Sequence, residues 1–567
     1  MSENFNIGLG KEEITPNVKD AIFLGFARPD QKLSGIKEKL YARTVLFQTK
    51  ATYFIYVNIE VGFVTDSIYQ TVFSKLLQNP LFKNFSRDQL HITAQHTHSS
   101  PGGYDYYPLY NMPNNGHVPK ILTHITSGIV GSIEKAYKDI SQATLEYQEG
   151  NFPQDSEVSF NRSLKAYFKN PEVTNKNLSP KEAAPKKVEM LVIKKNNAIK
   201  GFINWFPVHC TSIGSTNRYV HSDNKGIAAK VSEEGTDRVC IFSQGNAGDI
   251  TPNFIRERQK NRDFRGKFKD DFKSAEYNGK LQADQALKIL SKGISYKVEP
   301  LIDSELIYLD FSEMKTKDFT ETNNKRSAHG AMGVSFLSGS PVDGRAFPDL
   351  ISNIFSFLAL SLNYSHQTKN FVINRKKYKD RKIYEKLHGK KRIILDTGQK
   401  KFLASSRSRW LHIFRHVDPL MNTFAIQFFQ GALAENSWLP EVLPVQISQL
   451  GHVALISIPA ETTTMAGKRI KLALEPILEK KGISKVIIAP YSNNYCGYIT
   501  TPEEYEVQFY EGGHTLYGKW TLPALTYQLE KFATEFLKDK KDRNLDKQSI
   551  PPQFSSQELS KRTNTIL

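Results

Sequence analysis

Short apolar segments that stop at polar turns recur along the chain, and they limit what it can fold into. Four of them are rich in β-branched residues and end at Gly, Pro, Ser, Asn or His: Leu90–Gln95, Val239–Ser243, Val453–Ile458 and Val486–Ala489. Helical stretches, such as 121–138 and 462–478, alternate with these segments. The alternation predicts an α/β fold whose mixed β-sheets are flanked by helices.

The 567 residues contain no internal repeat and no linker that would separate independent domains. We therefore expect one large catalytic domain over residues 1–540, followed by a loosely ordered polar tail over residues 541–567. The apolar run Ile354–Leu362 is too short to span a bilayer, which needs roughly 20 apolar residues. A buried helix is the preferred interpretation of this run, and a surface element in contact with lipid is the alternative.

Lys and Arg outnumber Asp and Glu by 76 to 58, which gives a net charge of +18. This excess favours anionic partners, and the densest basic stretch, Arg375–Lys401, is interpreted as a surface insertion. Peripheral contact with an anionic membrane surface is a second interpretation. No nucleic-acid motif accompanies the charge, so we expect no nucleic-acid partner. The N-terminus lacks a secretory signal pattern, which leaves the cytoplasm or a signal-independent export route as expectations.

Unusual polar residues gather just beyond the predicted strands, where α/β folds commonly place catalytic groups. After the first strand, His96 and His98 point to the same side of an extended backbone, and a tight Ser-Ser-Pro-Gly-Gly turn follows. His209 ends the segment Asn204–His209, and a glycine-rich turn presents Thr251. Glu461 stands between a strand and a helix start. Each of these features alone is also compatible with a purely structural role.

Together the histidines and Glu461 make a catalytic zinc site plausible, because zinc takes imidazole and carboxylate ligands and keeps one position open for water. Such an ion polarises a carbonyl and lowers the pKa of a water molecule to about 7. Other chemistries lack their motifs: the sequence contains no GxSxG elbow, no HExxH helix, no P-loop and no dinucleotide-binding fingerprint. A tyrosine-rich segment, Tyr491–Trp520, mixes aromatic residues with Asn, Thr, Glu and Gly.

In order along the chain, eight segments resemble motifs of the neutral/alkaline (non-lysosomal) ceramidase family: Gly25–Gln31, His96–Gly103, Phe160–Ser163, Asn204–His209, Ser222–Asn224, Asn246–Asn253, Glu461–Gly467 and Tyr498–Tyr505. The resemblance reaches from near the N-terminus to about residue 530. It implies a catalytic domain with a zinc ion at the foot of a narrow pocket. We expect neither the C-terminal β-sandwich domain nor the signal peptide that many members carry.

The resemblance also implies roles for individual residues. The implied zinc ligands are His96, His209, Glu461 and Tyr498. The implied catalytic residues are His98, Arg162, Thr251 and Tyr510. The implied substrate-binding positions are Gly25 and Tyr517. Thr251 stands where the family usually has a serine, and Ala460 stands where a glycine is common.

The resulting hypothesis is a zinc-dependent hydrolase of the N-acyl amide bond of ceramide, which would release a fatty acid and a sphingoid base. Two alternatives stay open from the sequence. One is an amidase that acts on another N-acyl lipid or on an acylated amine, and the other is a non-catalytic lipid-binding protein that retains the pocket.

Overall fold

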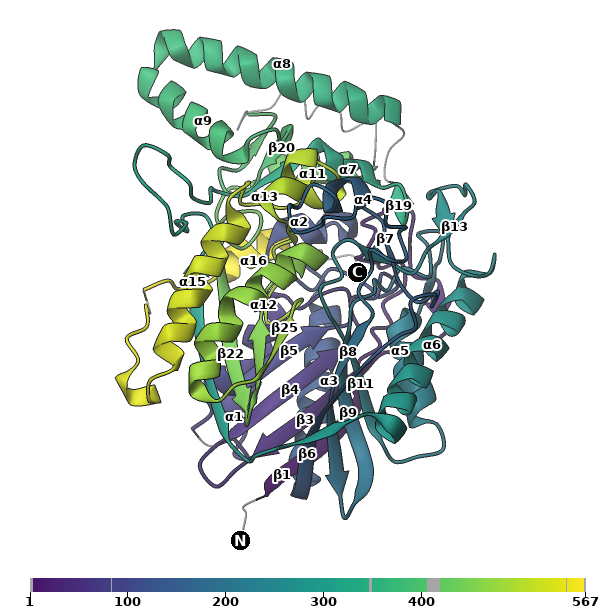
Figure 1. Ribbon diagram of the computed structural model, residues 1–567. Helices are drawn as coiled ribbons and strands as arrows, with labels where there is room; N and C mark the ends of the chain where they lie inside the picture. Colours follow the sequence, from purple (N-terminus) through teal and green to yellow (C-terminus); the bar gives the residue numbers. More distant parts are fainter. Residues whose placement is uncertain (1–3, 83, 346–348, 405–418, 547, 565–567) are drawn as a thin grey trace.

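The structure is a computed structural model that describes residues 4–82, 84–345, 349–404, 419–546 and 548–564. Two large mixed sheets lie face to face and helices cover their outer sides (Figure 1). The nine-stranded sheet is built from β1 (Phe5–Glu13), β3 (Tyr41–Gln48), β4 (Tyr53–Ile59), β5 (Leu90–Ala94), β6 (Ser141–Asn151), β8 (Lys187–Lys195), β9 (Ala198–Phe206), β11 (Val239–Gln244) and β15 (Ser295–Val298). The four-stranded sheet is built from β16 (Ile302–Asp310), β22 (Val442–Leu450), β23 (Val453–Ser457) and β25 (Lys485–Ala489).

A buried apolar layer joins the two sheets. Ile7 and Leu191 from the nine-stranded sheet pack in one cluster with Leu455 and Ile487 from the four-stranded sheet. Neighbouring residues on the same strands, such as Val192, turn to the opposite face because side chains alternate along a strand. Both faces of the nine-stranded sheet are therefore buried.

Helices form the two outer layers. The nine-stranded sheet is covered by α1 (Asp66–Gln78), α3 (Pro119–Lys138), α5 (Asp223–Glu233) and α6 (Asp271–Lys292). The four-stranded sheet is covered by α12 (Thr464–Leu478) and α15 (Thr521–Phe536). In α3 the stripe Ile121, Ile125, Ile129 and Ile133 recurs every four residues and is buried, as expected for a helix on a sheet. The predicted α/β class with mixed sheets and flanking helices is confirmed.

The polar segments of interest lie where strands of both sheets end. β5 is parallel to β4 and β9 is parallel to β11 in one sheet, and β23 is parallel to β25 in the other. Two short strands follow strands of the four-stranded sheet along the chain. β24 (Glu461–Thr462) comes after β23, β26 (Tyr498–Ile499) comes after β25, and the two short strands pair in parallel. This pairing sets Glu461 directly opposite Tyr498.

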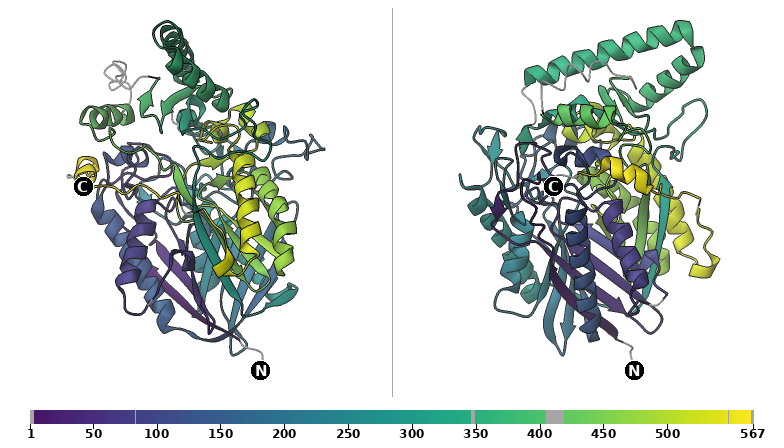
Figure 2. Two further views of the ribbon diagram at one scale, coloured as in Figure 1. Left: turned by 90° about the vertical axis from the view of Figure 1, so that its left-hand side faces the viewer. Right: turned by 180° about the vertical axis from the view of Figure 1, so that it is seen from behind.

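A cap of helices lies over these strand ends, at the end of the molecule opposite the N-terminus in all three views (Figures 1 and 2). It contains α7 (Val334–Ser338), α8 (Asp349–Ile373), α9 (Arg375–His388) and α11 (Pro419–Phe429), with the small strands β17 (Ala331–Gly333), β20 (Ile393–Asp396) and β21 (Lys401–Phe402). The buried helix predicted for Ile354–Leu362 is wrong in one respect. Phe355 and Ala359 are buried, but Ile354 and Phe357 are exposed. Within the described ranges no helix combines the length and apolar character that crossing a bilayer requires.

The C-terminal segment differs from the expected loosely ordered tail. It ends in α16 (Ser556–Arg562), whose Arg562 side chain is buried and donates hydrogen bonds to the carbonyl oxygens of Tyr106 and Ala432. Glu558 of the same helix accepts a hydrogen bond from Asn436. This helix therefore docks on the rest of the chain, and the domain boundary at residue 540 stays a prediction.

Candidate metal centre and cavity

Two histidine rings are held from behind by backbone carbonyl groups. His96 follows β5, and its Nδ1 lies 2.5 Å from the Gly62 oxygen. His209 follows β9, and its Nδ1 lies 2.7 Å from the Ala247 oxygen. A carbonyl oxygen only accepts hydrogen bonds, so each Nδ1 carries the hydrogen and each Nε2 keeps its lone pair. Burial lowers the pKa of His96 to about 4, which keeps this ring neutral at pH 7.

The Glu461 carboxylate lies between the two rings. Its oxygens are 3.2 Å from His96 Nε2 and 3.1 Å from His209 Nε2. The Tyr495 hydroxyl donates to one oxygen at 2.5 Å, and the Tyr491 hydroxyl donates to the other at 3.1 Å. These two hydrogen bonds favour the ionised form of the Glu461 carboxyl group.

These contacts bring hydrogen-bond acceptors together. The Nε2 atoms of His96 and His209 face carboxylate oxygens at hydrogen-bond distance, although neither side supplies a hydrogen in the assigned tautomers. Such groups repel each other unless a cation lies among them. A third imidazole joins them, because one nitrogen of each of His96, His98 and His209 lies within 4.8 Å of the others. This buried donor set fits a metal ion, and imidazole with carboxylate is the combination that suits zinc.

Tyr498 completes the predicted ligand set. Its hydroxyl oxygen is 3.4 Å from His209 Nε2 and accepts a hydrogen bond of 3.1 Å from Arg162. The β24–β26 pairing explains why Tyr498 lies beside Glu461. The structure therefore brings the four predicted ligands together, although they belong to four separate segments of the chain.

Arg162 is anchored on several sides. Its guanidinium donates to Asp343 at 2.6 Å, to Glu511 at 3.0 Å and to the Gly248 carbonyl oxygen at 2.8 Å. Burial opposes its charge, but Tyr498, Asp343 and Glu511 raise its pKa well above the ordinary value. Arg162 is therefore a fixed cation whose contact with the donor set is the Tyr498 hydroxyl.

Thr251 reaches this group indirectly. Its hydroxyl donates to Asp343 Oδ1 at 2.5 Å, and the Asn253 side-chain amide donates to the same oxygen at 2.7 Å. Asp343 in turn holds Arg162. Thr251 thus lies behind Arg162 rather than among the histidines, and a direct contact of its hydroxyl with substrate stays a prediction.

His98 is fixed by close packing. Its ring stands edge-on to Phe26 with 4.6 Å between the ring centroids, and its Nε2 is 3.1 Å from His96 Nε2. Gly25 lies against it so tightly that an added Cβ would be 2.2 Å from His98 Cγ. Burial lowers the pKa of His98 well below its ordinary value, so the neutral ring is the favoured form near pH 7. A neutral ring can still accept a proton.

The two remaining predicted positions have different surroundings. Tyr510 begins α14 (Tyr510–Gly513), and its ring centroid lies 5.5 Å from that of Tyr498. Within the described part of the chain its hydroxyl has no hydrogen-bond partner. Tyr517 is buried in the core instead, where its hydroxyl donates to the Pro440 carbonyl oxygen. The structure does not bring Tyr517 to the donor set, and its role in substrate binding stays a prediction.

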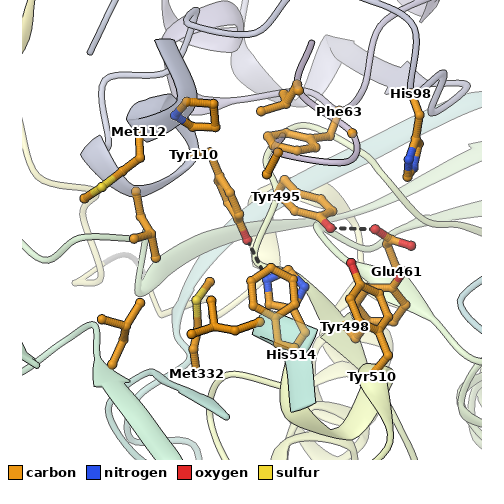
Figure 3. Close-up of a pocket in the computed structure, with 18 of the residues that line it drawn as sticks. Phe63, His98, Tyr110, Met112, Met332, Glu461, Tyr495, Tyr498, Tyr510 and His514 are labelled. Carbon is orange, nitrogen blue, oxygen red and sulfur yellow. Dashed lines mark hydrogen bonds between the residues drawn. The ribbon is translucent and has the colours of Figure 1, made fainter. Parts of the chain in front are cut away.

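A cavity opens on both sides of this cluster. Its apolar branch, seen in Figure 3, meets Glu461 and Tyr498 at one end and is lined beyond them by Phe63, Met112, Met332, Phe336, Leu395, Phe402 and Phe424. The second branch is more polar and is lined by Arg28, Asp30, Arg162, Asp343 and Arg345. Gly25, His98, Tyr498 and Tyr510 contribute to both branches. The cluster therefore lies at the junction of an apolar and a polar space.

Sequence reasoning missed several residues that hold the site. Asp343 and Glu511 bind Arg162, and Tyr491 and Tyr495 bind Glu461. The two tyrosines and Glu511 lie in the tyrosine-rich segment 491–520, whose composition was unusual in the sequence. That composition did not indicate which residues they would contact. Asp343 stands in a loop with no recognisable pattern, and only the folded structure reveals it.

The profile of neutral/alkaline non-lysosomal ceramidases, N-terminal part, matches residues 5–414 and 425–527. The chain belongs to this family. The neutral ceramidase of Pseudomonas aeruginosa is 29% identical to it over 92% of this chain and 70% of that protein. The neutral ceramidase of Mycobacterium tuberculosis is 26% identical over 96% of this chain and 79% of that protein.

Solved ceramidase structures share the fold. A ceramidase complexed with C2 superimposes with a TM-score of 0.78 at 27% identity, over 98% of this chain and 78% of that chain. The crystal structure of the Pseudomonas aeruginosa neutral ceramidase gives a TM-score of 0.75 over 98% of this chain and 77% of that chain. These matches confirm the family that the sequence motifs indicated.

Proposed function

We propose that this chain is a zinc-dependent amidohydrolase that cleaves the N-acyl amide bond of ceramide and releases a fatty acid and a sphingoid base. The observation that carries the proposal is the convergence of His96 Nε2, His209 Nε2 and the Glu461 carboxylate at the foot of an apolar cavity. The relatives named neutral ceramidases support the choice of substrate.

In this proposal His96, His209, Glu461 and Tyr498 hold the ion. A bound zinc ion polarises a carbonyl group and lowers the pKa of a water molecule. His98 accepts the proton of the attacking water and returns one to the leaving amine. Tyr510 donates its hydroxyl hydrogen to the developing oxyanion, because burial and the nearby Glu461 raise its pKa and keep it protonated.

Arg162 acts as a positioning residue in this scheme. Its contacts with Asp343, Glu511 and Gly248 occupy most of its hydrogens and fix the one that reaches Tyr498. The two branches of the cavity fit the two kinds of surface on a ceramide. The apolar branch takes a hydrocarbon chain, and the polar branch takes the hydroxyl-bearing head.

His209→Ala tests the proposal. The purified variant should lose both bound zinc, measured by elemental analysis, and hydrolysis of labelled ceramide, while its circular dichroism stays that of the wild type. His124→Ala, at an exposed position on α3, is the matched control and should keep both properties. A chelator should abolish wild-type hydrolysis. Full activity in a metal-free His209→Ala protein would overturn the assignment.

A further inference from the structure

The outward face of α8 is apolar and exposed. Ile354 is 50% exposed, Phe357 69% and Tyr364 71%, and Leu360 lies between them on the same face. Residues 350–365 contain no charged side chain at all. A helix face turned to water is ordinarily polar, so an apolar stripe of this length marks a surface with a partner.

A dense group of cations lies beside this stripe. α9 follows α8 directly and exposes six basic side chains: Arg375, Lys376, Lys377, Lys379, Lys382 and Lys386. Its acidic residues are Asp380 and Glu385, and Glu385 is paired with Arg381 at 2.7 Å. Arg381 also donates to Asn363 of α8 at 2.8 Å, which ties the basic helix to the apolar one.

α8 packs against α7, whose Phe336 and Leu337 line the apolar branch of the cavity. Phe355 and Ala359 pack in the same apolar cluster as Phe402 and Phe424, which line the apolar branch. The exposed stripe therefore belongs to a helix that lies next to an element of the cavity wall, at the end of the molecule that carries the cap (Figures 1 and 2).

We propose that α8 and α9 form the surface with which this protein docks on an anionic lipid bilayer. The apolar stripe of α8 enters the interfacial region, and the α9 cations meet the lipid phosphates. The inference deepens the proposed function and rests on it, because docking there would bring the cavity to a membrane-borne substrate. A second copy of the chain fits less well, since a two-fold pair through this face would bring the two α9 helices, each with its six cations, to one interface.

Vesicle co-sedimentation tests the proposal without reference to turnover. The probes are phosphatidylcholine vesicles with and without phosphatidylglycerol. The double variant Ile354→Ser/Phe357→Ser removes apolar surface, and Lys376→Glu/Lys379→Glu reverses charge. The matched controls are Leu472→Ser/Ile550→Ser, at exposed apolar positions elsewhere, and Lys273→Glu/Lys288→Glu on α6.

Wild-type protein should sediment with the anionic vesicles, less so at high salt, and hardly with phosphatidylcholine alone. Each α8 or α9 variant should lose about tenfold in partition coefficient, and each control should stay within about twofold. Unchanged binding in the α8 and α9 variants would overturn the proposal. So would a wild-type dimer that Ile354→Ser/Phe357→Ser converts to a monomer in light scattering.

A separate assay keeps docking distinct from catalysis. Ile354→Ser/Phe357→Ser should hydrolyse detergent-dispersed ceramide at the wild-type rate and vesicle-borne ceramide about tenfold more slowly. Equal loss on both substrates would contradict a docking role. If the wild type binds anionic vesicles through α8 but hydrolyses neither substrate, the docking surface stands and the proposed function fails.

Discussion

At the scale of single residues, Gly25 shows how backbone shape determines the position of a side chain, that of His98. A Cβ at this position would lie 2.2 Å from His98 Cγ and 2.6 Å from His98 Cα. The second contact cannot be relieved by a side-chain rotation, because it involves the backbone of His98. Gly25 is therefore required by the position of His98, whether or not it also touches substrate.

Gly25→Ala should lower kcat/KM for ceramide by roughly 100-fold, because a displacement of a reacting group by about 1 Å has an effect of that size. Zinc content should change little, since the four proposed ligands are untouched. Gly131→Ala is the control, because its new Cβ would meet only the flexible Glu12 side chain at 3.2 Å. Wild-type kinetics in Gly25→Ala would show that the site tolerates a shifted His98.

Thr251 gives a second prediction, which concerns its hydrogen bond to Asp343. Thr251→Val keeps the shape but removes the hydrogen, which should loosen Asp343 and Arg162 and lower kcat/KM about tenfold. Thr251→Ser keeps the donor and should stay within about threefold of wild type. Zinc content should be unchanged in both variants. Equal activity of Thr251→Val and Thr251→Ser would rule out this role for the hydroxyl.

The proximity of the proposed ligand residues could be anticipated from the sequence, whereas much of the network that supports them could not. His96, His209 and Glu461 follow short apolar strands, so both their position and their chemistry leave a local pattern. Asp343 has no such pattern, because its role arises from contacts with Arg162 and Thr251, which are distant along the chain. A tertiary contact of this kind leaves no trace in local residue order.

At the scale of elements, Glu149 on β6 links the two large sheets. It accepts hydrogen bonds from Tyr147 on its own strand and from Lys485 on β25, and Lys187 on β8 pairs with it at 2.9 Å. Partial burial opposes its ionisation, but these partners outweigh burial and lower its pKa to about 2. The ionised carboxylate is therefore the form that stabilises the sheet packing.

Glu149→Gln should lower the free energy of unfolding by about 1 kcal/mol at pH 7, a modest value because solvent screens this half-buried group. A carboxyl with a depressed pKa stabilises the fold above its unfolded-state pKa. The difference between wild type and variant should therefore shrink as the pH falls from about 4.5 towards 2. Urea titrations across this range measure it, with the exposed Glu321→Gln as control. A difference that grows on acidification would contradict the assignment.

Elements with a regular pattern were predictable, and those without one were not. The strand predicted at Leu90–Gln95 is β5, and the helix predicted at 121–138 is α3. In α8 the prediction of burial was wrong, because an uncharged apolar run looks the same whether both faces or only one is covered. Whether a face of this helix is covered depends on the neighbouring elements, which the residues of the apolar run do not determine.

At the scale of the whole molecule, the C-terminal helix α16 is part of the packed structure. Arg562 pairs with Glu558 at 2.5 Å, and both side chains are buried. Arg562→Ala should lower the free energy of unfolding by about 3 kcal/mol, because it leaves a buried carboxylate without its cation. Thermal and urea denaturation measure this, with the exposed Arg218→Ala as control. A wild-type melting curve for Arg562→Ala would mean that α16 contributes nothing to stability.

The proposed ligands are residues 96, 209, 461 and 498. The first two follow strands of the nine-stranded sheet, and the last two follow strands of the four-stranded sheet. Neither sheet holds a complete site on its own. During synthesis both histidines leave the ribosome long before Glu461 and Tyr498 exist, so a nascent chain has only half of the donor set. A metal ion held by this proposed set would be captured tightly only after the final part of the chain is made. It would stabilise only the finished molecule, and its binding would mark the completion of folding.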